Sequence, residues 1–138
     1  MERESWLPAA PESAPLARSI VRESATRSGL DRDAVWDLML ATTEAVANAV
    51  EHGSACGESG QILLRVLSCG EVLYVEVCDC GDDGGALAEF DPENPGPANF
   101  ESTAGRGLPI IAAVVDLMEV RPGAGETRVR FGKRVLAA

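Results

Sequence analysis

The chain has few aromatic residues, few basic residues and no long apolar run. Aromatic side chains make up 4% of its 138 residues, whereas apolar residues as a group make up 46%, so we expect an aliphatic core. No run reaches the roughly 18 apolar residues that a membrane-spanning helix needs. Residues 1–12 lack the charged segment and apolar stretch of a secretory signal. These absences predict a cytoplasmic protein that contacts no membrane, with a length that suits one domain.

The balance of charge is acidic, because 22 acidic side chains outnumber 12 basic ones and give a formal net charge of −10. Proteins that grip nucleic acids usually present a concentrated positive surface. The charge therefore argues against direct nucleic-acid binding, although it suits a basic protein partner.

The four cysteines, Cys56, Cys69, Cys78 and Cys80, do not have the paired spacing of a zinc site. Cys78 and Cys80 are two residues apart in a predicted strand and so share one face of it. We expect free, buried thiols in a reducing compartment, and no metal bound by cysteine.

The first half of the chain is predicted to be mainly helical. Prolines near the start predict that residues 1–13 form an extended arm, with room for one short edge strand. Residues 14–138 are predicted to form a single domain. Apolar residues at three- and four-residue steps predict a helix over residues 16–28 and a longer one that ends at His52. Asp31 has the place and side chain of an N-cap for the longer helix.

The second half is predicted to contain most of the strands. Two runs rich in branched residues, 61–68 and 72–80, predict a hairpin. A helix follows Gly107, and two final strands are expected around residues 117–120 and 127–131. Strands grouped after helices indicate an α+β fold. We expect a two-layer sandwich, in which a mixed, mainly antiparallel sheet carries helices on one face.

Between Gly81 and Gly105 the sequence is rich in glycine, proline and acidic residues (GDDGG, then DPENPGPANFESTAG). Such a stretch does not support regular structure for long, and it exceeds the usual length of a connection. Two interpretations stay open for residues 82–106: a disordered surface loop, or a lid over a ligand.

The long helix carries polar residues along one edge. Glu44, Asn48 and His52 are four residues apart, so successive members are displaced by only about 40° around the helix axis. Their neighbours are small alanines, which would let a ligand approach closely. The stripe is either the solvated face of the helix or a site in which an asparagine oxygen binds Mg²⁺ and a carboxylate accepts a proton.

Two glycine-containing segments are further candidates for binding chemistry. Asp79 and Gly81 end a predicted strand, where a carboxylate can accept a hydrogen bond from an amine and a glycine lets a base approach the backbone. Gly105, Arg106 and Gly107 precede a helix, where backbone amides and an arginine can meet phosphate oxygens. Each segment alone is also common in ordinary turns and helix starts.

Together and in this order, the three segments resemble a known set of motifs. EAVANAVEHG, VCDCGDDG and GRGLPII are similar to the N, G1 and G2 boxes of the GHKL (Bergerat-fold) ATPase superfamily. The resemblance is strongest to its small single-domain branch, the bacterial anti-sigma factor serine/threonine kinases, and it covers about residues 14–131. It implies the Bergerat ATP-binding fold.

The resemblance implies a role for each matching position. Glu44 would be the general base for a serine hydroxyl, Asn48 would bind Mg²⁺ and Asp79 would recognise the adenine amino group. Further positions around the nucleotide would be Gly81, Gly84, Gly105, Arg106, Gly107, Leu108 and Thr127. One residue departs from the pattern: Asp83 stands at the second glycine of the G1 box. Either the loop shifts by one residue or the nucleotide affinity is reduced.

The function that the resemblance implies is an ATP-dependent serine/threonine protein kinase that acts as an anti-sigma factor. Its partners would be a sigma factor and an antagonist (anti-anti-sigma) protein that it phosphorylates, with ATP and Mg²⁺ as cofactors. Related kinases are often homodimers, and the oligomeric state stays open. The alternative is an ATP-binding anti-sigma or regulatory module with little or no kinase turnover, which the altered G1 box favours. A two-component sensor kinase fits less well, because no paired phospho-acceptor helices are evident in the sequence.

Overall fold

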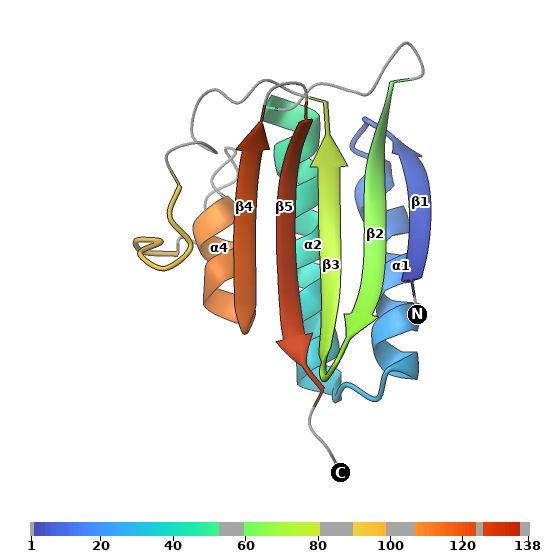
Figure 1. Cartoon of the computed structure of the whole chain (residues 1–138). Coiled ribbons are helices and arrows are strands. Elements are labelled where there is room, and N and C mark those ends of the chain that lie inside the picture. Colours follow the sequence, from blue (N-terminus) through green and yellow to red (C-terminus); the bar gives the residue numbers. More distant parts are fainter. Residues whose placement is uncertain (1, 53–59, 81–89, 99–106, 124–125, 136–138) are drawn as a thin grey trace.

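One layer of the structure is a five-stranded sheet, and the other consists of helices that cover one face of it (Figure 1). The computed structural model describes residues 2–52, 60–80, 90–98, 107–123 and 126–135. The strands lie in the order β1-β2-β3-β5-β4, and each pairing between them is antiparallel. The predicted α+β sandwich is confirmed. Its elements are β1 (Glu2–Pro8), α1 (Ser13–Arg27), α2 (Arg32–His52), β2 (Gln61–Cys69), β3 (Val72–Asp79), α4 (Gly107–Val114), β4 (Leu117–Gly123) and β5 (Glu126–Arg134).

Strand β1 is an edge strand within residues 1–13, where the sequence predicted an extended arm with one possible short strand. It pairs with β2 from Glu2 opposite Leu67 to Pro8 opposite Gln61. The hydroxyl of Ser13, the first residue of α1, donates a hydrogen bond to the carbonyl of Pro8 and ties the strand to the helix. Helix α1 therefore begins earlier than its apolar spacing predicted.

Helix α2 begins where the sequence predicted. A side-chain oxygen of Asp31 accepts a hydrogen bond of 2.8 Å from the backbone N–H of Ala34, as an N-cap does. Gly29 has a φ of 89° between the helices, a left-handed conformation that glycine adopts without steric strain. The chain reverses there, so α1 and α2 run in opposite directions behind the sheet (Figure 1). In the described part of the chain, no helix is both long enough and apolar enough to cross a membrane.

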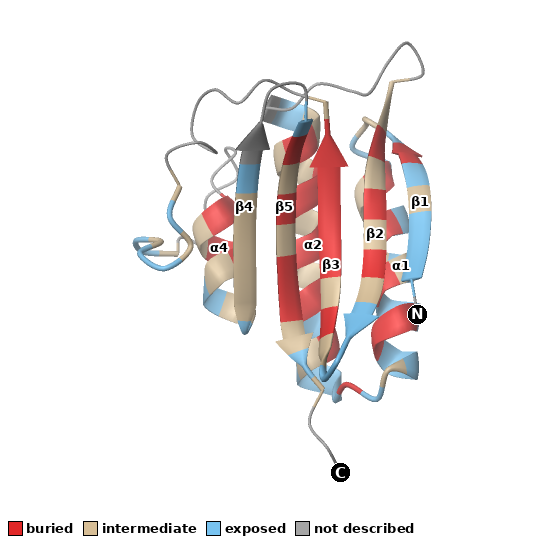
Figure 2. Cartoon of the chain, in the orientation of Figure 1, coloured by how far each residue is buried: buried red, intermediate tan, exposed pale blue. Residues whose placement is uncertain are grey.

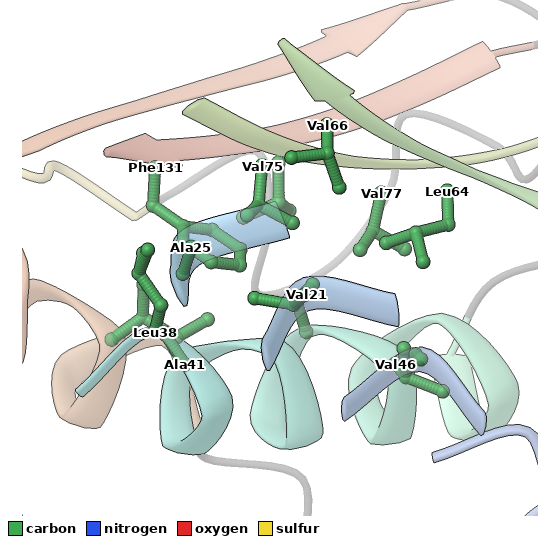
Figure 3. Packing of buried hydrophobic residues seen from close by; sticks show 14 of the residues in the cluster. Val21, Ala25, Leu38, Ala41, Val46, Leu64, Val66, Val75, Val77 and Phe131 are labelled. Carbon is green, nitrogen blue, oxygen red and sulfur yellow. The ribbon is translucent and has the colours of Figure 1, made fainter. Parts of the chain in front are cut away.

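The core lies between the sheet and these two helices. Alternate residues of each strand point toward the helices, and Figure 3 shows their side chains meeting those of α1 and α2. Burying one large apolar side chain contributes about 1.5–3 kcal/mol relative to leaving it exposed. Central members are Leu64, Val66, Val75, Val77 and Phe131 from the strands, with Val21, Ala25, Leu38, Ala41 and Val46 from the helices.

Among the described residues, no helix covers the other face of the sheet, the open face, which Figure 2 views directly. One row of paired positions on this face alternates in charge across the five strands: Glu4, Arg65, Glu76, Arg130 and Glu119. Glu76 at the centre is only 1% exposed. Its carboxylate lies 2.9 Å from Arg130 Nη2 and 3.5 Å from Arg65 Nη1. In this row, opposite charges on neighbouring strands compensate one another.

Strands β4 and β5 extend beyond the predicted residues 117–120 and 127–131. The end of β5 stays in the sheet because β3 pairs with it as far as Arg134, opposite Val72. The residues that extend β5, Gly132, Lys133 and Arg134, are neither branched nor aromatic and give no strand signal in the sequence.

Residues 90–98 are the described part of the predicted lid. The side chain and carbonyl of Asp91 accept hydrogen bonds of 3.0 Å from the N–H groups of Glu93 and Asn94, which forms a turn. Phe90 packs against the core. The rest of residues 82–106 lies outside the described residues, so the choice between surface loop and lid stays open.

Candidate functional site

Four chain segments lie in the upper half of the molecule as it is drawn in Figure 1. They are the C-terminal half of α2, the end of β3, the start of β5 and the start of α4. Asp79 of β3 is paired with Thr127 of β5, and Gly107 of α4 lies against Glu44 of α2. The N-box and G2-box motifs are therefore in contact through Glu44 and Gly107, and the G1-box carboxylate is in contact with Thr127.

Asp79 and Thr127 form a buried polar pair on the helix-covered side of the sheet. They are 6% and 3% exposed, and the Thr127 hydroxyl donates a hydrogen bond of 2.6 Å to Asp79 Oδ1. Asp79 follows Val75 and Val77 at alternate positions of β3, so its side chain shares their face. A carboxylate has several acceptor sites, so Asp79 can accept from an amine as well as from Thr127. The pair suits recognition of a ligand amino group.

Glu44 lies half-buried on α2 beside the first turn of α4. Burial raises the pKa of its carboxyl, and the negative charge of Glu51 raises it further. A carboxylate with a raised pKa accepts a proton more readily near neutral pH. Sequence reasoning missed the influence of Glu51, although its place two helical turns after Glu44 was a visible signal.

Helix α4 presents its N-terminal end to the same region. The first backbone N–H groups of a helix have no acceptor within the helix, so this end attracts anions such as phosphate. Gly107 places no side chain between α4 and Glu44. Leu108 is buried, and its side chain belongs to the core.

Asn48 lies half-buried one turn after Glu44 on α2. The two residues share an edge of the helix, and the amide oxygen of Asn48 is a donor of the type that Mg²⁺ prefers. The other predicted positions, Gly81, Gly84, Gly105 and Arg106, lie outside the described residues, as does the side chain of His52.

The cysteines differ in part from the prediction of free, buried thiols. Cys69 is free but exposed, because it ends β2 next to the hairpin turn. Cys80 stands directly after the last residue of β3, outside the ladder, and it is disulfide-bonded rather than free. Cys78 is free and buried as predicted; burial, with the charge and hydrogen bond of Glu76, raises the pKa of its thiol to about 12. Cys56 lies outside the described residues.

Comparison with known proteins agrees with this geometry. The profile of the histidine kinase-like ATPase domain family matches residues 7–133, which is nearly the whole chain. The chain belongs to this family. Membership implies that this histidine kinase-like domain uses ATP.

Curated relatives of this histidine kinase-like domain include serine-protein kinases named RsbW. The RsbW of Listeria monocytogenes serovar 1/2a is 33% identical over 114 residues, which cover 80% of this chain and 73% of the relative. The RsbW of Bacillus pumilus is 30% identical over 132 residues, which cover 90% of this chain and 80% of the relative. The superfamily and branch predicted from the sequence motifs are confirmed.

Solved structures share the fold of this domain. A crystal structure of the RsbU and RsbW domains of a Mycobacterium tuberculosis protein matches with a TM-score of 0.70 and 26% identity. The match covers 97% of this chain and 32% of the longer one, so this chain spans about a third of that protein. A histidine kinase domain of Erythrobacter litoralis matches with a TM-score of 0.58 and 19% identity over 94% of this chain and 62% of that one. That second likeness shows the fold alone.

Proposed function

We propose that this chain is an ATP-dependent serine-protein kinase that also acts as an anti-sigma factor. The observations that carry the proposal are the buried Asp79–Thr127 pair at the end of β3 and the contact of Glu44 with the first residue of α4. This arrangement offers an amine acceptor, a proton acceptor and an anion-attracting helix end in one region. The names of relatives that are 33% and 30% identical, serine-protein kinases, support the same activity.

ATP suits these residues group by group. Asp79 can accept a hydrogen bond from the exocyclic amine of adenine, while the hydroxyl of Thr127 holds the carboxylate in place. The backbone amides at the start of α4 can donate to phosphate oxygens. Gly107 has no Cβ, so the Glu44 side chain can lie directly against the backbone of this turn.

Mg²⁺ fits the same region through Asn48, whose amide oxygen is a hard donor on the edge of α2 that also carries Glu44. When bound, the ion would neutralise negative charge on the phosphate oxygens. Asp82 and Asp83 directly follow Gly81, which is predicted to lie near the nucleotide, and their negative charges would repel the phosphates. Neutralisation by Mg²⁺ would offset this repulsion.

In the proposed reaction, a serine hydroxyl of a protein substrate is the nucleophile. Its oxygen forms a bond to the γ-phosphorus of ATP while the bond from that phosphorus to the bridging oxygen breaks, and ADP leaves. The hydroxyl proton passes to the carboxylate of Glu44. The raised pKa of Glu44 suits it to this task.

The partners would be a sigma factor that the chain sequesters and an antagonist protein that it phosphorylates. A phosphoserine adds about −1.5 to −2 of charge at neutral pH. This chain has a formal charge of −10, so repulsion would weaken its contact with the phosphorylated antagonist.

The direct test is phosphate transfer from γ-labelled ATP to candidate antagonist proteins in the presence of Mg²⁺. Phosphoserine is expected with the wild type, and Glu44→Gln is expected to transfer about 100-fold more slowly, because glutamine cannot accept the proton. No transfer by the wild type to any candidate, or equal transfer by Glu44→Gln, contradicts the kinase proposal.

The altered G1 box, with Asp83 in place of glycine, favours one other outcome. ATP binding without phosphate transfer, together with sigma-factor capture that Asp79→Asn leaves unchanged, would indicate a regulatory binding module instead. Phosphate transfer, measured together with sigma-factor capture, therefore distinguishes a kinase from a binding protein.

A further inference from the structure

Helix α4 approaches α2 so closely at one point that a side chain has no room. A Cβ atom placed on Gly107 would lie 2.5 Å from Glu44 Oε2, 2.8 Å from Glu44 Cβ and 3.2 Å from Glu44 Cδ. Carbon atoms in non-bonded contact normally lie about 3.5–4.0 Å apart. Any residue other than glycine at this position would therefore collide with Glu44.

Backbone conformation does not explain this glycine. The φ of Gly107 lies outside the left-handed region, unlike those of Gly29, Gly60, Gly70 and Gly96. Residue 107 begins a helix, and glycine is a weaker helix former than alanine. The structural reason for glycine at this position is the space that Glu44 occupies.

Neither helix can easily move away from the contact. Ala41 and Ala45, on either side of Glu44 in α2, are 0% and 1% exposed, and Ile110 and Ile111 in α4 are 2% and 0% exposed. Atoms added to such packed regions force shifts of backbone and side chains. Because the Cβ of Glu44 moves only with α2, rotating the carboxylate alone would not relieve the collision.

We propose that Gly107 is the positioning residue for Glu44: its missing side chain lets the carboxylate lie against the first turn of α4 and defines where it lies. This inference rests on the proposed kinase function, in which Glu44 accepts the serine proton. The motif resemblance gives Gly107 only a backbone position at the nucleotide. A misplacement of about 1 Å in a reacting group can lower a rate about 100-fold.

The test is Gly107→Ala, with Gly132→Ala as the matched control. A Cβ at Gly132 would also collide, at 2.9 Å from both Tyr74 and Val72, but toward the end of the β3–β5 ladder that lies away from Asp79 and Thr127. Both variants should lose stability. Only Gly107→Ala should lower kcat for transfer from Mg·ATP to the acceptor serine, by about 100-fold.

A Glu44→Gln background separates positioning from a purely structural effect. Glutamine keeps the shape of glutamate, so Gly107→Ala should destabilise both backgrounds equally in denaturant unfolding. Gly107→Ala should slow phosphate transfer in the background with Glu44 but not in the Glu44→Gln background. A double-mutant cycle measures this difference. An equal fractional loss of rate in both backgrounds would overturn the inference.

Glu44→Asp gives a second test that does not depend on the folding of Gly107→Ala. It keeps the negative charge but withdraws the carboxylate by one methylene, so kcat should fall about 100-fold with KM for ATP little changed. A kcat equal to that of the wild type would overturn the inference. Absence of transfer by the wild type would instead contradict the proposed function, so the two failures are distinguishable.

Discussion

Two buried carboxylates lie three residues apart in β3, and their surroundings differ. Glu76 is on the open face, where Arg130 and Arg65 approach its oxygens to 2.9 and 3.5 Å. Asp79 is on the helix-covered face, where it accepts a hydrogen bond of 2.6 Å from the uncharged hydroxyl of Thr127. An odd spacing in a strand places two side chains on opposite faces, so one strand carries both.

This difference distinguishes an acid that stabilises the fold from an acid that suits a ligand. Burial raises the pKa of Glu76, but hydrogen bonds from Arg130 and Cys78 and the charges of Arg130 and Arg128 outweigh it and lower that pKa. The arginines neutralise Glu76 and hold it in place. The hydroxyl of Thr127 orients the carboxylate of Asp79 but carries no charge, unlike the arginines beside Glu76.

The largest expected effect is that of Asp79→Asn on nucleotide affinity. Asparagine keeps the shape but loses the charge that strengthens a hydrogen bond to the adenine amine, so we expect the affinity for Mg·ATP to fall about 100-fold. Isothermal titration calorimetry measures it, and Glu76→Gln is the matched control because it neutralises the acid on the opposite face. If both variants bind ATP equally well, Asp79 does not bind the nucleotide and does not differ from Glu76 in this respect.

The converse prediction concerns stability. Glu76→Gln removes the buried charge that pairs with the half-buried Arg130 and Arg65, and it should lower the free energy of unfolding by about 2 kcal/mol. Glu4→Gln removes an exposed partner of Arg65, a pair 2.6 Å apart, and should cost under about 1 kcal/mol. Denaturant unfolding of both variants measures these losses. Equal losses in the free energy of unfolding would show that a buried charge pair at Glu76 stabilises the fold no more than the exposed pair at Glu4.

Thr127→Val should have a smaller effect on ATP binding than Asp79→Asn. Valine keeps the shape of threonine but cannot donate to Asp79, so the carboxylate is less well fixed and affinity should fall about tenfold. Thr42→Val is the control, because that buried hydroxyl donates within α2 to the carbonyl of Leu38. Equal ATP affinities in the two threonine variants would speak against the Asp79–Thr127 pair.

The smallest expected effect is the acid sensitivity that Glu76 contributes. Because its native pKa is lowered, its contribution to stability is present above the ordinary value of 4.5 and is lost as the pH falls through the lower native value. In urea unfolding between about pH 5 and pH 3, Glu76→Gln should lose about 1 kcal/mol less than the wild type. Identical pH dependence in the two proteins would contradict the lowered pKa.

Much of the fold could be predicted because its signals are local. Asp31 and the apolar steps after it predicted α2, and branched runs predicted β2 and β3. The ends of β4 and β5 could not be predicted, since their polar residues belong to the sheet only through pairing with strands distant in sequence. The row of alternating charges around Glu76 could not be predicted for the same reason, because each of its members comes from a different strand.

The candidate site was predictable as a set of motifs but not as a set of contacts. Motif order indicated Glu44, Asp79 and Thr127, and the structure brings Asp79 and Thr127 within hydrogen-bonding distance across 48 residues of sequence. The collision that makes Gly107 necessary depends on how α4 packs on α2, which no local pattern encodes. The predicted glycines of the G1 box remain predictions.

Selectivity between ATP and inosine triphosphate tests the role of Asp79 most directly. Inosine carries an oxygen where adenine carries its amino group, so a carboxylate at this position should repel it. The wild type is expected to bind ATP about 100-fold more tightly than inosine triphosphate, and Asp79→Asn is expected to lose most of that preference. Equal affinity of the wild type for the two nucleotides would contradict the assignment of this end of the sheet as the adenine site.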